Sequence, residues 1–74
     1  MIVLIGDKLP NKVRGVLKNW FVEIKKDVFI STINYQLSER ILEFVSDKFN
    51  KNLKFVLIQA SNKSKNLIDF YFKN

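Results

Sequence analysis

The sequence predicts a small α+β domain in which two helices cover one face of a four-stranded sheet. Two observations predict this fold class. Four short segments are β-branched and apolar, or alternate between apolar and polar residues, as strands do. Two longer segments place apolar residues every three or four positions, as amphipathic helices do. Their order is strand, helix, strand, helix, strand, strand, and with 74 residues and no internal linker we assign residues 1–74 to a single domain.

The first strand and the first helix occupy the N-terminal third of the chain. The run from Ile2 to Gly6 is continuously apolar, which is typical of a strand at the centre of a sheet. Pro10 suits the first turn of a helix, because its missing N–H costs nothing there. The spacing that follows predicts a helix of about four turns, closed by residues 25–27. Its predicted core face consists of Val13, Val16, Leu17, Trp20, Phe21 and Ile24.

The remaining elements follow in the same way. Residues 28–30 predict a second strand, and Asn34 is placed to cap a second helix over residues 35–49. Residues 53–60 and 67–72 predict two further strands, joined as a hairpin by the polar residues 61–66. Because the helices cover only one face of this sheet, the other face needs a cover, and a homodimer packed through the sheets provides it. The predicted core stripe of the second helix is Leu37, Ile41, Leu42, Phe44, Val45 and Phe49.

The amino-acid composition excludes several kinds of functional site and favours one kind of partner. The absence of cysteine excludes disulfides, thiolate nucleophiles, zinc fingers and iron–sulfur clusters, and the absence of histidine removes the commonest general base. The opening apolar run is too short to span a membrane and lacks the features of a signal peptide, so we expect a cytoplasmic protein without a membrane partner. Thirteen basic residues against seven acidic ones give a net charge of +6, which favours a polyanionic partner.

Basic side chains align on the predicted first helix. Arg14, Lys18 and Lys25 fall in one narrow stripe, with Lys12 near its start and Lys26 following it. Such a row is able to contact successive phosphates, although an ordinary solvated helix face looks the same. Gly15 lies inside this helix at an energetic cost. Either a neighbouring element or a nucleic-acid backbone approaching closely would explain it.

Asp7 is the candidate catalytic and metal-binding residue, since it ends the first strand beside the basic region. Phosphodiester chemistry with Mg²⁺ normally uses two or more carboxylates, and a dimer would bring two Asp7 residues together. The alternative is a turn-forming aspartate that bonds local N–H groups. Other acidic residues, such as Glu23, look dispersed on solvated faces, and the spacing of Trp20 favours the core over a base-stacking surface.

The chain resembles the small adaptation subunit called CRISPR-associated protein 2, in its type I-E branch. The likeness covers nearly all 74 residues and rests on an ordered set of features rather than on one motif. These are an acid after the first strand, a Pro-x-x-x-Arg-Gly helix start, a later Trp, and a Val-aromatic-Val-like second strand. Here they are Asp7, Pro10 to Gly15, Trp20 and Val28-Phe29-Ile30, with Ala60-Ser61-Asn62 similar to an Ala-Thr-Asn turn.

The resemblance implies a ferredoxin-like homodimer that bridges two dimers of the CRISPR integrase, adaptation protein 1. It implies a non-catalytic scaffold for double-stranded prespacer DNA, in which Lys12 and Arg14 match the basic pair that grips the DNA backbone and Lys25 matches another basic position. Two alternatives stay open: a Mg²⁺-dependent endonuclease acting on RNA or DNA through the acid that Asp7 matches, and a purely interacting module. The type I-E pattern also continues into a C-terminal tail strand, which we expect this chain to lack.

Overall fold

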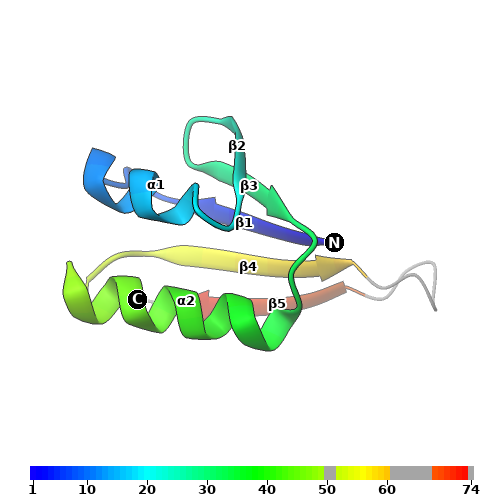
Figure 1. The fold of residues 1–74 in the computed structure, drawn as a ribbon. Coiled ribbons are helices and arrows are strands. Elements are labelled where there is room, and N and C mark those ends of the chain that lie inside the picture. Colours follow the sequence, from blue (N-terminus) through cyan, green and yellow to red (C-terminus); the bar gives the residue numbers. More distant parts are fainter. Residues whose placement is uncertain (50–51, 61–67, 74) are drawn as a thin grey trace.

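The computed structural model describes residues 1–49, 52–60 and 68–73. The α+β class predicted from the sequence is confirmed, with both helices on one face of the sheet (Figure 1). The elements in chain order are β1 (Ile2–Gly6), α1 (Asn11–Leu17), β2 (Val22–Lys25), β3 (Val28–Ser31), α2 (Tyr35–Lys48), β4 (Phe55–Ala60) and β5 (Ile68–Lys73).

The strand order of the sheet is β2-β3-β1-β4-β5, and every neighbouring pair is antiparallel. The four strands β2-β3-β1-β4, with α1 and α2 as the crossovers, form the ferredoxin-like arrangement. β5 extends this sheet by pairing with β4. The predicted central position of the first strand is confirmed, because β1 lies between β3 and β4.

The prediction of a four-turn first helix is wrong. α1 ends at Leu17, and the next turn is tightened by hydrogen bonds from Asn19 N–H to the Val16 carbonyl and from Trp20 N–H to the Leu17 carbonyl, both 3.1 Å long. The chain then reverses into β2, which forms a hairpin with β3. Residues 22–25 alternate apolar and polar side chains, a strand period that the helical spacing of the preceding residues concealed. The strands predicted over 28–30, 53–60 and 67–72 are therefore the third, fourth and fifth.

β2 is an edge strand with an irregular register. Val22 pairs with Ile30 and Glu23 with Phe29, but Lys25 rather than Ile24 pairs with Val28. The extra residue makes a β-bulge, which bends the strand and interrupts its ladder of hydrogen bonds.

The core lies between the sheet and the two helices. Phe29 of β3 is fully buried, and its ring meets that of Phe21 edge-on with 6.4 Å between centroids. Gly6 admits Leu9 to this core, since a Cβ at position 6 would collide with the Leu9 side chain. Trp20, Ile24, Leu37 and Phe44 were predicted to be core residues but are exposed. The buried apolar set is Ile2, Leu4, Leu9, Val13, Leu17, Phe21, Phe29, Ile41, Leu42, Val45, Leu53, Phe55 and Leu57.

The prediction that Asn34 caps the second helix is confirmed in α2. The Asn34 side chain accepts a hydrogen bond of 2.7 Å from Leu37 N–H, which satisfies one of the free amides at the start of the helix. Of the helices in the described ranges, none has both the length and the apolar character needed to cross a bilayer.

Over β1 to β4, the face of the sheet that the helices leave open carries aliphatic side chains. Alternation along β1 turns Ile2 and Leu4 toward the helices and Val3 and Ile5 away from them. The neighbouring strands continue this pattern, because Val3 pairs with Ile30 on one side and with Ile58 on the other. We call this the open face; its described members are Val3, Ile5, Val22, Val28, Ile30, Val56 and Ile58.

Candidate nucleic-acid interface

Glu23 of β2 joins the first helix to the β2–β3 hairpin. Its two carboxylate oxygens lie 3.1 Å from Arg14 Nε and 3.2 Å from Lys18 Nζ, and the Asp27 N–H donates a hydrogen bond of 3.1 Å to Oε2. The Glu23 side chain is only 10% exposed. The prediction that it lies on a solvated face is therefore wrong. Glu23 stands on the helix side of the sheet because it pairs with the buried Phe29 across the hairpin.

This environment stabilises the charged form of Glu23. Burial raises the pKa of Glu23, but the hydrogen bond from the Asp27 backbone, the hydrogen bond from Lys18 and the charges of Arg14 and Lys18 outweigh burial. The net result is a pKa below the ordinary glutamate value of 4.5. Glu23 is thus ionised at neutral pH and offsets part of the charge of the two basic side chains beside it.

Arg14 is held against the protein rather than free in solvent. Its side chain is 23% exposed, and one terminal nitrogen donates a 3.1 Å hydrogen bond to Asn11 Oδ1. Nε is buried, and its contact with Glu23 is an ion pair without the alignment of a hydrogen bond. Arg14 is therefore largely committed to positioning α1 on the hairpin.

Asp27 fastens the β1–α1 loop to the hairpin turn. Its carboxylate accepts a 3.2 Å hydrogen bond from Leu9 N–H, and its carbonyl accepts one of 2.8 Å from Gly6 N–H. Asp27 has a φ of 65°, a left-handed conformation that aspartate adopts more readily than most residues. The sequence pattern predicts only that Asp27 closes a helix. Together with Glu23 it makes α1 and the β2–β3 hairpin one connected unit.

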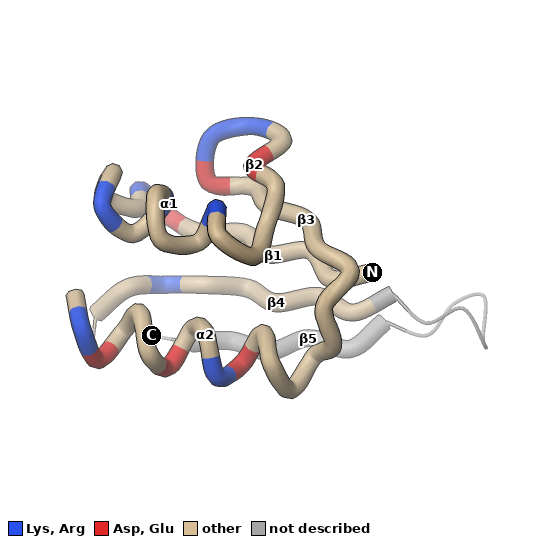
Figure 2. The backbone as a smooth tube through the Cα atoms, in the orientation of Figure 1, with Lys and Arg blue, Asp and Glu red and all other residues tan. Residues whose placement is uncertain are grey.

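The predicted phosphate contacts do not form a single helical stripe. Lys12 is on α1, as predicted, and Lys18 caps the C-terminal end of this helix, but Lys25 lies in β2 and Lys26 in the hairpin turn. Because α1 is bound to the hairpin, both groups belong to one surface, and Figure 2 shows the basic positions over these segments. We call this the basic surface; its members are Lys8, Lys12, Lys18, Lys25 and Lys26, all exposed.

The basic surface is positively charged because two acidic side chains of the same segment, Glu23 and Asp27, do not face solvent. Residues 1–31 carry six basic and three acidic residues, a net charge of +3. Glu23 and Asp27 turn inward, so five exposed lysines face solvent with one exposed acid, Asp7. In α2, by contrast, three acidic residues outnumber two basic ones, and Figure 2 shows both signs interspersed along this helix.

Asp7 lies exposed where β1 ends, as predicted. Its side chain makes no hydrogen bond to any residue in the described ranges, so the turn-forming alternative is not what the structure shows there; Asp27 bonds the nearby Leu9 N–H instead. Among the side chains that the structure describes, no three acidic residues gather as metal ligands do. Asp7 therefore belongs to no group of three acidic ligands among these described side chains.

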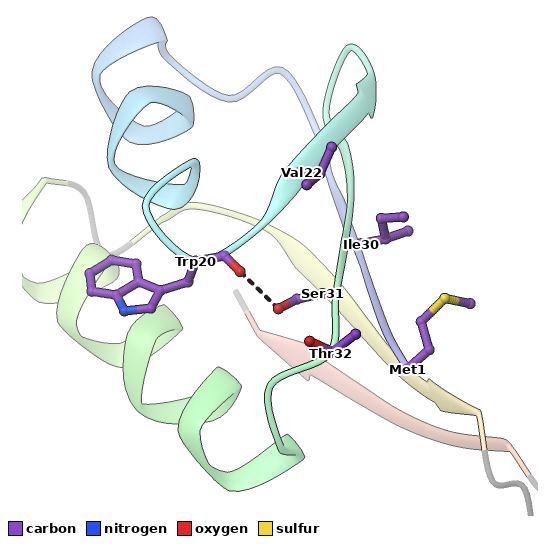
Figure 3. A pocket seen from close by; sticks show the side chains of 6 residues that line it. All are labelled: Met1, Trp20, Val22, Ile30, Ser31 and Thr32. Atoms are coloured by element: carbon purple, nitrogen blue, oxygen red, sulfur yellow. Dashed lines mark hydrogen bonds between the residues drawn. The ribbon is translucent and has the colours of Figure 1, made fainter.

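Trp20 lies between two shallow apolar grooves. One, of about 220 Å³, is lined by Met1, Val22 and Ile30 together with Ser31 and Thr32 (Figure 3). Ser31 Oγ donates a 2.8 Å hydrogen bond to the Trp20 carbonyl, which fixes the turn after α1. The other groove, of about 280 Å³, is lined by Trp20, Arg40, Ile41 and Phe44. No carboxylate lines either of these two grooves.

Comparison with known proteins identifies the family. The family model described as CRISPR-associated protein (Cas_Cas2CT1978) matches residues 1–71, which include α1, the hairpin and the whole basic surface. No curated protein matches the chain. Because the family model spans nearly the whole sequence, the chain belongs to this CRISPR-associated Cas2 family.

Proposed function

We propose that the protein is a non-catalytic homodimeric scaffold for CRISPR spacer acquisition that binds double-stranded prespacer DNA through its phosphate backbone. A CRISPR role follows from the family. The observation that carries DNA binding is the basic surface, where five lysines are exposed while Glu23 and Asp27 are turned inward. Lysines that contact phosphates supply affinity without base recognition, so binding is independent of sequence.

Lys12 is a proposed phosphate ligand that is not engaged by any described acidic side chain of the protein. It is exposed and forms no ion pair with any described residue, whereas Lys18 is shared with Glu23 and Arg14 is mostly buried. Lys25 and Lys26 extend the contact from α1 onto the hairpin. Arg14 contributes mainly by holding α1 in place, so its predicted role as a bidentate phosphate ligand becomes the weaker part of the proposal.

Replacing Lys12 by alanine should weaken binding to duplex DNA of any sequence. Each phosphate neutralised contributes about 0.9 to the slope of log affinity against log salt, so Lys12→Ala should reduce that slope by about 0.9. Titration of a labelled duplex at several salt concentrations measures this slope. Lys48→Ala, which removes the same charge from α2, is the matched control and should change the slope much less. Salt-independent binding by the wild-type protein, or none, would refute the proposed function.

The proposed homodimer packs through the open face. Seven described residues of this face are aliphatic, and a second copy would remove them from water and place two basic surfaces on one particle. Such a dimer is the unit that we propose bridges two dimers of the CRISPR integrase, adaptation protein 1. Co-purification with the integrase and a duplex, followed by a mass measurement of the assembly, tests this arrangement.

A second candidate function is a Mg²⁺-dependent endonuclease, which the exposed and unbonded carboxylate of Asp7 favours. One carboxylate does not fit the ligand needs of Mg²⁺, so this function requires the second Asp7 of a dimer. Asp7→Asn should then abolish cleavage of RNA or DNA in Mg²⁺ buffer while leaving the melting temperature in place. Asp47→Asn, an exposed acid on α2, is the control. Cleavage that survives Asp7→Asn would eliminate the endonuclease.

A further inference from the structure

No contact within the described protein explains why residue 15 of α1 is a glycine. It is the fifth of the seven residues of α1, where glycine is less favourable than alanine. Its φ is not positive, so the backbone does not require glycine. A Cβ added at this position would meet no atom within 4 Å, so no neighbouring element approaches it closely. Of the two explanations left open by the sequence, the approach of an element of the same chain is therefore excluded for the described residues.

Gly15 lies on the outward face of α1, between two exposed lysines. At 100° per residue it lies opposite the buried Val13 and Leu17, near the middle of the outward face of the helix. Lys12 and Lys18 lie three residues before and after it, about 9 Å apart along the axis, and both are exposed. The bare main chain at Gly15 is therefore flanked by two members of the basic surface.

We propose that Gly15 is where the phosphate backbone of the duplex lies against the main chain of α1, between Lys12 and Lys18. This inference rests on the proposed function and adds a steric requirement to it. A side chain at position 15 would stand between the two lysines and hold the sugar–phosphate chain away from the helix. Without one, the backbone approaches closely enough for both ammonium groups to reach phosphate oxygens from opposite sides.

Two uncharged substitutions, Gly15→Ala and Gly15→Gln, test the proposal. Both residues favour helix and suit the observed backbone, so both variants should melt at or above the wild-type temperature. Duplex affinity should nevertheless fall, modestly for alanine and by about tenfold for glutamine, the fold-change expected for one lost charge-assisted hydrogen bond. Gln36→Ala on α2, an exposed position away from the basic surface, should bind as the wild type does.

The salt dependence separates a steric effect from a loss of charge. Gly15→Ala keeps both lysines, so it should lower affinity at every salt concentration while reducing the slope by less than Lys12→Ala does. Wild-type affinity in both folded Gly15 variants would overturn this inference while leaving the proposed function standing. A wild-type protein that does not bind duplex at all would overturn both, so the two failures are distinguishable.

Discussion

Replacing Val3 by glutamate should dissociate the proposed dimer into monomers without unfolding the protein. Val3 sits in the central strand β1, between Ile30 and Ile58 on the open face. In a monomer the new carboxylate would point into water and cost little. In a sheet-packed dimer, two-fold symmetry would bury two unpaired carboxylates, at several kcal/mol, which weakens dimerisation on the order of 1,000-fold.

Sedimentation equilibrium gives the oligomeric state of the Val3→Glu variant, and circular dichroism checks that it is folded. Gln36→Glu adds the same charge to the exposed surface of α2 and should remain dimeric. The monomeric variant should also bind a long duplex more weakly, because the second basic surface no longer acts on the same particle. A Val3→Glu protein that stays dimeric at the wild-type concentration would show that the open face is not the interface.

Replacing Glu23 by glutamine should change stability and DNA affinity in opposite directions. The variant loses the ion pairs of 3.1 Å and 3.2 Å that bind α1 to the hairpin, and it leaves the mostly buried Arg14 without its counter-charge. The fold should therefore melt at a lower temperature at neutral pH. At the same time the net charge rises from +6 to +7, and Lys18 is released, so affinity for duplex DNA should increase.

The pH dependence of the Glu23→Gln effect follows from the lowered pKa. Because the pKa of Glu23 in the folded protein is below the ordinary value of 4.5, its contribution to stability is present above that value and is lost as the pH falls through the folded pKa. The melting temperatures of the wild type and of Glu23→Gln should therefore differ most near neutral pH and converge under acidic conditions.

Glu43→Gln is the matched control for Glu23→Gln. It makes the same change of net charge on the exposed side of α2, where no ion pair is formed with the residues that the structure describes. Melting curves from neutral to acidic pH, with duplex titrations at neutral pH, compare the two variants. If both variants melted and bound DNA alike, the link between α1 and the hairpin would not depend on Glu23.

Local signals in the sequence predicted several elements correctly. The β-branched run of β1, the side-chain cap at Asn34 and the apolar spacing around Val45 each depend on residues close together in the chain. β2 was missed because Leu17, Trp20 and Phe21 continue a helical spacing past the real end of α1. The turn there depends on a tertiary hydrogen bond, from Ser31 Oγ to the Trp20 carbonyl, which local spacing does not reveal.

Four lysines of the basic surface, Lys12, Lys18, Lys25 and Lys26, were singled out from the sequence, but neither Lys8 nor the arrangement of the surface was. Lys12 and Arg14 lie on α1 as expected, because the start of that helix is marked by Pro10. Lys25 and Lys26 reach the same surface through the hairpin, and the hairpin is placed by Glu23. In the sequence, Glu23 cannot be told from a solvated acid. Its ion-pair partners, Arg14 and Lys18, are nine and five residues away and meet it only after the chain reverses. The sequence signal that indicates the hairpin strand is the alternation of apolar and polar residues over 22–25.

The bulge in β2 also influences how copies of this protein meet. A regular edge strand offers unpaired N–H and carbonyl groups to a neighbouring chain, which favours open-ended growth of a sheet. Here the ladder is broken between Glu23 and Lys25, and Lys25 adds charge at the same point. Stacking of edges into filaments is thereby disfavoured at β2. The proposed dimer through the open face does not need this edge, because the open face lies on the broad side of the sheet.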